Sequence, residues 1–143
     1  MQIRSFVPAD EDAVVRLWTE CGLVRPWNDP RRDIHRKLTV QPDLFLIAEE
    51  DGGVVGSAMV GYDGHRGWVN YLAVAGEHRG RGHARALMER AEHELLMLGC
   101  PKLNLQVRAG NDAVIAFYHS LGYTEDHAVG LGKRLIPDGP APS

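Results

Sequence analysis

The sequence predicts an α/β fold of the α+β type, in which a mixed, mostly antiparallel central sheet of six to seven strands is flanked by about four helices. Three β-rich stretches, 44–50, 54–62 and 68–74, follow one another across short glycine-containing turns, which is typical of an antiparallel meander. The next stretches read as a helix ending at Gly99 and a strand over 102–107. A strand, helix and strand in this order predict a parallel crossover pair, so that the sheet is mixed.

Composition limits the classes of protein to consider. The 143 residues are 44% hydrophobic and 24% charged, typical of a soluble globular domain, and we expect one domain over residues 1–137 with a flexible tail over 138–143. A net charge of −3 argues against a nucleic-acid partner. No apolar run is long enough to predict a membrane span, and no secretory signal is evident. Cys21 and Cys100 lack metal-site spacing, so we expect reduced thiols, a cytoplasmic protein and no metal.

The N-terminal part predicts a strand over 2–6 and a helix that begins after Pro8 and stops at Gly22. Apolar residues recur along this helix at helical spacing: Ala13, Val14, Leu17, Trp18 and Cys21. A loop over 23–30 follows, in which Trp27 either plugs the edge of the core or walls a pocket.

A second helix should begin at Pro30 and run to about Val40, capped by Asn28 or Asp29. Ile34 and Leu38 are expected to face inward. The basic residues Arg31, Arg32, Arg36 and Lys37 are expected to face outward, as a solvated helix face rather than a binding patch.

The stretch from Tyr71 to Leu98 reads as a strand, a basic glycine-rich turn and a helix. The turn lies where the first N–H groups of the helix have no partner within the helix, and Gly80 and Gly82 allow close approach to the backbone. Arg79 and Arg81 add positive charge there. Together these features predict a phosphate or pyrophosphate site. The Gly-Lys-Ser/Thr ending of a P-loop is missing, and Arg85 replaces the third glycine of a dinucleotide fingerprint.

The rest of the chain continues the alternation of helices and strands. The inner face of the helix after the turn is expected to carry Ala84, Leu87, Met88, Ala91, Leu95 and Leu98. Asn111 is a suitable N-cap for a helix to about Leu121, and short strands are expected over 123–126 and 129–136.

The pattern Arg79-x-x-Gly82-x-Ala84 resembles the acyl-CoA signature of the GNAT superfamily of N-acetyltransferases, and the order of elements from Ile3 to Ile136 is similar to the GNAT fold. The resemblance implies acetyl-CoA as cofactor and a sheet splayed at its parallel strand pair, where the pantetheine arm lies. It implies that the Val74 N–H polarises the thioester carbonyl. The cofactor-binding residues so implied are Leu72, Ala73, Val74, Arg79, Gly80, Arg81, Gly82, His83, Ala84, Asn111 and Tyr118.

Asn111 and Tyr118 are seven residues apart, so they project from about the same helix face. From the residues alone, Asn111 is a helix cap and Tyr118 a core aromatic. The resemblance implies instead that Asn111 bonds the pantetheine arm and that Tyr118 is the general acid for the leaving thiolate.

A narrower resemblance, to the bacterial YpeA-type branch of acetyltransferases, is carried by residues 23–30, 61–67, 99–102 and 131–136. It implies little about the substrate.

Many members of the superfamily carry a glutamate on the central strand as general base, but residues 68–71 read Trp-Val-Asn-Tyr. The proton acceptor therefore stays open among Glu49, Asp63, His65 and a water held by Asn70 and Tyr71. The acceptor site is expected between two loops, with Trp27 and Asn28 on one and Tyr62, Asp63 and His65 on the other.

The resemblance implies an enzyme that moves acetyl from acetyl-CoA to a primary amine, on a small molecule, peptide or protein, by direct attack in a ternary complex. The alternative is a non-catalytic acyl-CoA sensor, which the missing glutamate favours and Tyr118 opposes. A nucleic-acid-modifying acetyltransferase is disfavoured by the acidic pI of about 6.1. No membrane partner is expected, and a homodimer stays an open alternative.

Overall fold

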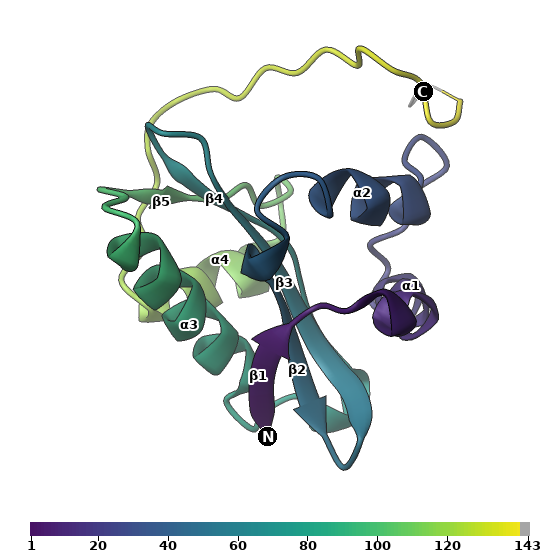
Figure 1. Ribbon diagram of the computed structural model, residues 1–143. Coiled ribbons are helices and arrows are strands. Elements are labelled where there is room, and N and C mark those ends of the chain that lie inside the picture. Colours follow the sequence, from purple (N-terminus) through teal and green to yellow (C-terminus); the bar gives the residue numbers. More distant parts are fainter. Residues whose placement is uncertain (141–143) are drawn as a thin grey trace.

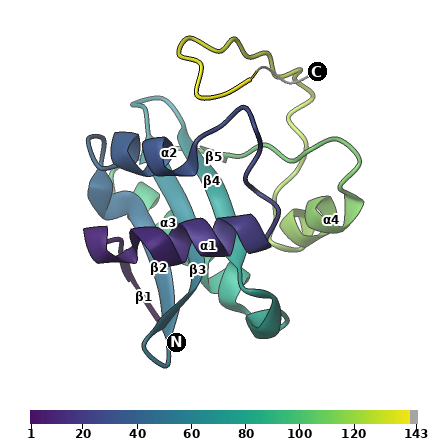
Figure 2. The ribbon, with the colours of Figure 1, turned by 90° about the vertical axis from the view of Figure 1, so that its right-hand side faces the viewer.

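A computed structural model describes residues 1–140 as a five-stranded sheet with helices on both faces (Figures 1 and 2). The strands are β1 (Gln2–Ser5), β2 (Phe45–Glu50), β3 (Gly53–Tyr62), β4 (Gly67–Val74) and β5 (Leu103–Asn104). The helices are α1 (Glu11–Glu20), α2 (Pro30–Lys37), α3 (His83–Met97) and α4 (Asp112–Ser120), with short 3₁₀ turns at Pro8–Asp10, Pro42–Leu44 and Gly76–His78. In the described part of the chain, no helix is both long and apolar enough to cross a membrane.

The sheet has the order β1-β2-β3-β4-β5, which confirms the antiparallel meander and the parallel crossover. β2, β3 and β4 pair antiparallel in succession, and β4 pairs with β5 in parallel at Gly67↔Leu103 and Trp68↔Asn104. The α1 and α2 helices lie on one face, and α3 and α4 lie on the other (Figure 1).

The predicted count of six to seven strands is wrong, because residues 1–140 form five. The strand expected over 102–107 is reduced to Leu103–Asn104, and residues 123–126 and 129–136 form no strand. After α4 the chain leaves the sheet and runs as an extended arm over to the α2 side (Figure 1). Because the arm does not pack on the sheet, its apolar side chains remain in solvent, and Val129, Leu131 and Leu135 are 85–95% exposed.

The end of this arm is held against α2. The Asp138 side chain is fully buried, and its two carboxylate oxygens each accept a 2.7 Å bond from the Arg36 guanidinium. Arg32 and Arg134 lie 3.4 and 3.3 Å from the same carboxylate. The tail predicted over 138–143 therefore begins at an anchored residue; residues 141–143 lie outside the described part of the chain, and the domain boundary at 137 stays a prediction.

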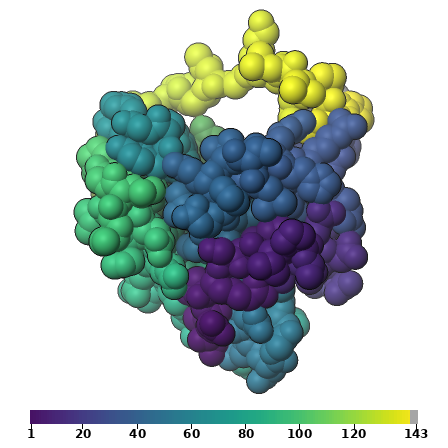
Figure 3. Space-filling view, viewed as in Figure 1, coloured from purple at the N-terminus to yellow at the C-terminus, as the bar shows by residue number. Residues whose placement is uncertain are grey.

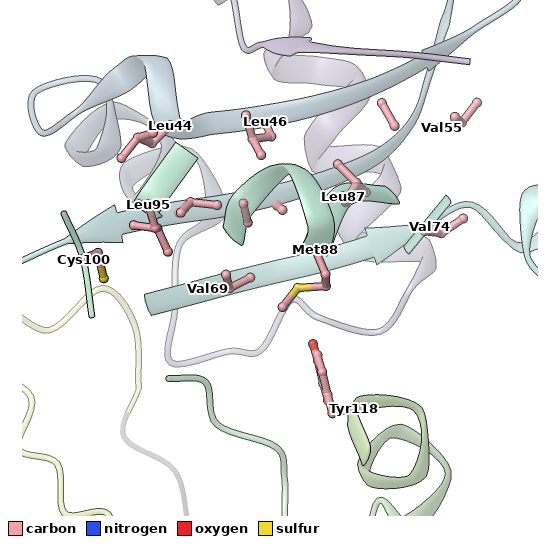
Figure 4. Close-up of a cluster of buried hydrophobic side chains, with 14 residues drawn as sticks. Leu44, Leu46, Val55, Val69, Val74, Leu87, Met88, Leu95, Cys100 and Tyr118 are labelled. Carbon is pink, nitrogen blue, oxygen red and sulfur yellow. The ribbon is translucent and has the colours of Figure 1, made fainter. Parts of the chain in front are cut away.

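The core has two halves, one on each face of the sheet. Figure 4 shows the half beneath α3, where Leu87, Met88 and Leu95 pack onto side chains of β2, β3 and β4. Beneath α1 and α2, Trp18, Ile34 and Phe45 are fully buried. A Cβ on Gly56 would lie 3.0 Å from the Ala73 carbonyl and 3.1 Å from Leu87, so the small residues of β3 allow α3 to pack closely.

Two expected orientations are corrected. Lys37 is buried rather than outward, because its Nζ lies close to Gly61 of β3, 3.6 Å from a Cβ built there, and this burial lowers the pKa of its ammonium. Leu98 is 52% exposed, because α3 ends at Met97 and the chain turns away at Gly99. The cap of α2 is Asp29, whose carboxylate accepts from the N–H groups of Arg31 and Arg32.

Candidate functional site

A bulge interrupts the pairing of β4 with β3, next to the parallel β4–β5 pair at the end of the sheet. Ser57 pairs with Ala73 and Met59 with Asn70, so Tyr71 and Leu72 together oppose Ala58. Tyr71 adopts φ +53°, a left-handed conformation uncommon for a non-glycine residue. Within residues 1–140, β5 pairs only with Gly67 and Trp68, so the outer edge of β4 carries no strand from Val69 onward. The two strands separate after this short pairing, but the pair that was predicted to be central lies at the end of the sheet.

The backbone of β4 offers free groups along this edge. Ala75 N–H donates to Val55 O on β3 at 2.8 Å. Because backbone groups alternate along a strand, the N–H groups of Leu72 and Val74 face the opposite, open edge. Ala73 faces β3 instead, and its side chain is buried. Leu72 and Val74 are thus available to a ligand through their main chain, whereas Ala73 is not.

The turn after β4 leads directly to the N-terminus of α3. Gly80 and Gly82 adopt φ +77° and +81°, and no protein atom lies within 4 Å of a Cβ built on either. Gly82 is the N-cap of α3, and no side chain caps the helix there. These glycines are therefore needed for the shape of the turn, and the first N–H groups of α3 are left for an external acceptor.

A cavity of about 390 Å³ lies at this helix start. Six residues predicted from the sequence line it: Val74, Arg79, Gly80, Gly82, His83 and Ala84. The sequence analysis missed four other lining residues, namely His78, Arg85, Phe117 and Ser120. Phe117 and Ser120 come from α4, so only the tertiary fold places them beside the turn.

The basic residues of the turn have different roles. Arg79 Nε donates to the Val74 carbonyl at 3.1 Å, tying the turn to the end of β4. Arg81 is 58% exposed and stays free to meet an anion. The His83 ring is buried with Nε2 3.0 Å from Glu50 Oε2, and His78 Nε2 lies 3.4 Å from the same oxygen. Hydrogen bonding from His83 holds the pKa of Glu50 below its usual range. The His83 side chain therefore links the start of α3 to β2 through Glu50.

Asn111 and Tyr118 occupy the positions that residue reasoning gave them. The Asn111 carboxamide accepts from Val114 N–H at 3.4 Å and caps α4, as expected. Tyr118 is 8% exposed and packs edge-to-face on Phe117 and Tyr123. Figure 4 shows its oxygen pointing from α4 toward β4. This hydroxyl has no hydrogen-bond partner in the described part of the chain, and burial raises the pKa of Tyr118 to about 12. Whether either residue binds a cofactor stays a prediction.

The two loops predicted to border the acceptor site have different surroundings. Asn28 reaches β4, where its Nδ2 donates to the Tyr71 hydroxyl at 2.8 Å. On the other loop, the Asp63 carboxylate accepts from His65 N–H at 2.8 Å and Arg66 N–H at 2.7 Å, and these bonds lower its pKa. The Asp63 side chain thus stabilises the turn formed by residues 63–66. No hydrogen bond joins Tyr62, Asp63 or His65 to Asn28 or Trp27 within residues 1–140.

One carboxylate that the sequence analysis did not single out lies at the opening. The Tyr71 hydroxyl donates to Asp33 Oδ2 at 2.6 Å. By contrast, Glu49 lies on β2, two strands from β4, and is ion-paired with Arg4, so it is not placed to serve the opening. Asp33 sits among basic residues of α2, and no sequence signal distinguishes it from a surface acid.

Comparison with known proteins agrees with this geometry. A family model described as "Acetyltransferase (GNAT) family" matches residues 11–123. The chain is 54% identical to an acetyltransferase of Yersinia enterocolitica and 55% identical to one of Pectobacterium atrosepticum, each over 96% of this chain and 98% of that protein. Among solved structures, the ribosomal-protein-S18-alanine N-acetyltransferase of Escherichia coli aligns with TM-score 0.72 and 25% identity, over 87% of this chain and 77% of that one. AAC(6')-Iy in complex with a CoA bisubstrate analogue has the same fold, with TM-score 0.77 and 18% identity over 94% and 98% of the two chains.

Proposed function

The chain belongs to the GNAT acetyltransferase family, and we propose that it transfers an acetyl group from acetyl-CoA to a primary amine by direct attack in a ternary complex. The observation that carries the proposal is the cavity at the start of α3, which adjoins the open edge of β4. A pyrophosphate needs N–H donors and positive charge, and both are present at this position.

The residues of the turn fit a diphosphate. The backbone N–H groups from Gly80 to Ala84 surround an uncapped helix terminus. Arg81 and Arg85 provide positive charge, since the Arg81 guanidinium is more than half exposed with only a long, 4.0 Å contact to Glu50, and Arg85 lines the cavity. Arg79 has a structural role instead, because its hydrogen bond to Val74 O holds the turn against the end of β4. Acetyl-CoA, when bound, supplies the acetyl group as a thioester.

The open edge of β4 would hold the pantetheine arm. The N–H of Leu72 suits an amide carbonyl of the arm, and the Asn111 side chain is proposed to bond it from α4. The N–H of Val74 is proposed to donate to the thioester carbonyl, where negative charge develops during attack. A donor of this kind typically contributes about 2.7–4 kcal/mol.

Tyr118 is proposed as the general acid. Its raised pKa keeps the phenol protonated at neutral pH, and its hydroxyl has no competing acceptor within residues 1–140. Its direction toward β4 suits protonation of the leaving thiolate (Figure 4). General acids of this type contribute about 10²–10⁴-fold in rate.

A pair of glycine variants tests the pyrophosphate assignment. Gly82 and Gly99 lie just beyond opposite ends of α3, both have φ +81°, and neither has a neighbour within 4 Å of a built Cβ. Gly82→Glu and Gly99→Glu therefore introduce the same strain and charge at opposite poles of one helix. We expect Gly82→Glu to abolish acetyl-CoA binding in calorimetry and Gly99→Glu to retain it. Retained binding in Gly82→Glu, or equal loss in both variants, would refute the assignment.

The second candidate is a non-catalytic acyl-CoA sensor, which the absence of a carboxylate in residues 68–71 favours. The two functions differ in turnover. Thiol release from acetyl-CoA, followed across panels of alkyl amines, peptides and polyamines, should depend on the amine if the protein is an enzyme. Tight acetyl-CoA binding without amine-dependent release would establish the sensor instead.

A further inference from the structure

We propose that the Asp33 carboxylate, held by Tyr71, binds the ammonium group of the acceptor and takes the proton that the amine loses on acetylation. This inference rests on the proposed function and deepens it, because it assigns the acceptor class as a primary alkylammonium. It also identifies a carboxylate for the role that no residue of the 68–71 stretch of β4 can fill.

Three separate elements converge on one hydroxyl. Tyr71 on β4 donates to Asp33 Oδ2 at 2.6 Å and accepts from Asn28 Nδ2 at 2.8 Å. Asn28 is itself oriented, because its Oδ1 accepts from Arg25 N–H at 2.7 Å. The loop before α2, α2 itself and the central strand are thereby joined at the opening of the sheet.

Tyr71 is held rigidly in this position. Its ring stacks on Trp18 at 3.7 Å between ring centroids, with 9° between the planes. Trp18 Nε1 donates to Ser57 Oγ at 2.9 Å, and that hydroxyl donates to Tyr71 O at 2.8 Å. Burial and the neighbouring Asp33 raise the pKa of the Tyr71 phenol, so it keeps its proton and acts as a donor. A non-glycine residue in the left-handed region costs energy, and such residues concentrate at functional sites.

Asp33 keeps capacity for a ligand. Its side chain is 25% exposed, and a carboxylate has about four acceptor positions. Tyr71 occupies one, and Arg36 Nη1 lies 3.3 Å from Oδ1. Arg36 makes its two short bonds, both 2.7 Å, with Asp138. Arg134, the other cation near Tyr71, also lies beside Asp138 at 3.3 Å. The surrounding arginines are therefore paired mainly with Asp138, and Asp33 is left able to accept an ammonium.

The position suits an acceptor. Tyr71 directly precedes Leu72, whose N–H faces the open edge of β4, and its ring packs on the α1/α2 face, whereas Tyr118 belongs to the α3/α4 face. Amine and leaving thiolate would then be served from opposite faces of the sheet. An open groove of about 530 Å³ is lined by residues 132–136 and by Arg36, which contacts Asp33 at 3.3 Å. Figure 3 shows an opening between the C-terminal arm and the α2 region.

The step balances as follows. The bound ammonium first releases one proton to water and becomes a neutral amine. The amine nitrogen then uses its lone pair to bond to the thioester carbonyl carbon, and the carbon–sulfur bond breaks with its electron pair on sulfur. The sulfur takes the Tyr118 proton, and the nitrogen passes its proton to Asp33. An alkyl ammonium has a pKa of ~10.4, but once the neutral amine has bonded to the acyl carbon its nitrogen is much more acidic, so a carboxylate suffices to take this second proton. Water restores both residues between turnovers.

The test uses Asp33→Asn, with Asp12→Asn as matched control. Asp12 is also helical and bonded to an arginine, but it is 81% exposed on α1. Binding of n-butylammonium and of 1-butanol to the acetyl-CoA complex is measured by saturation-transfer NMR. We expect the wild type and Asp12→Asn to bind n-butylammonium in preference to 1-butanol. Asp33→Asn should lose that preference while keeping its acetyl-CoA affinity.

Kinetics provide a second readout on the alkyl amine that the panel identifies. Asp33→Asn should raise KM at least tenfold, lower kcat as well, and remove the acid limb of the kcat/KM profile. Tyr71→Phe, which keeps the stacked ring, should raise KM less and retain the limb, because Tyr71 is a positioning residue. Equal n-butylammonium binding by the wild type and Asp33→Asn, or no binding by either, overturns the inference. If the wild type does not bind acetyl-CoA, the proposed function is overturned instead.

Discussion

Replacing Tyr118 by phenylalanine separates catalysis from packing at the residue proposed as general acid. The change removes only the hydroxyl and keeps the ring against Phe117 and Tyr123. Because the hydroxyl has no hydrogen-bond partner within residues 1–140, its removal leaves no buried group unpaired, and we expect the free energy of unfolding to change by less than about 1 kcal/mol. Turnover should fall at least tenfold, which corresponds to about 1.4 kcal/mol of transition-state stabilisation, and the upper end is set by the ~10²–10⁴-fold range of general acids.

Tyr123→Phe is the matched control. Its ring packs edge-to-face on Tyr118 with centroids 5.7 Å apart, but its hydroxyl donates to Glu92. Losing that bond should cost about 0.5–1.5 kcal/mol of stability and leave turnover unchanged. The assay is thiol release at saturating acetyl-CoA, with thermal unfolding and calorimetric acetyl-CoA affinity measured on each variant. Full turnover in Tyr118→Phe would show that the tyrosine is only a core aromatic and that water protonates the thiolate.

Two further predictions concern the scaffold. Gly67→Ala should lower the free energy of unfolding by about 1–3 kcal/mol, because the new methyl would lie 2.6 Å from Leu95 Cδ1 in a packed core; an unchanged melting temperature would contradict the packing. Asp138→Asn should speed trypsin cleavage after Lys133 and Arg134 at pH 7, since the carboxylate anchors the C-terminal arm to Arg36 and its loss lets the exposed arm move. Arg36 lowers the pKa of Asp138 to about 2 from 3.8, so the anchor should be complete above about pH 4 and be lost as the pH falls toward 2; trypsin sensitivity equal to the wild type at pH 7 would rule out the anchor.

The meander, the crossover and the pyrophosphate turn could be predicted because their signals are local. Period-2 and period-3.6 patterns decide strand and helix, and positive φ at Gly80 and Gly82 follows from residues that tolerate it. The same local patterns failed at the C-terminus. Residues 129–136 alternate like a strand, yet a strand forms only where a neighbour offers its edge, and the chain leaves the sheet before that point. The outward orientation predicted for Lys37 was wrong for a similar reason, because the helical pattern of α2 does not reveal that β3 lies against this side chain.

The amino-acid sequence by itself determined the family, the order of elements and the residues of the turn at the start of α3, since each depends on residues that are close together in the sequence. Only the tertiary structure decided which carboxylate faces the opening of the sheet. Asp33 and Tyr71 are 38 positions apart, and their 2.6 Å contact exists because a bulge turns Tyr71 out of the regular strand while Trp18 fixes its ring. A local pattern records the preference of a segment, whereas a hydrogen bond between α2 and β4 depends on how both segments pack against α1.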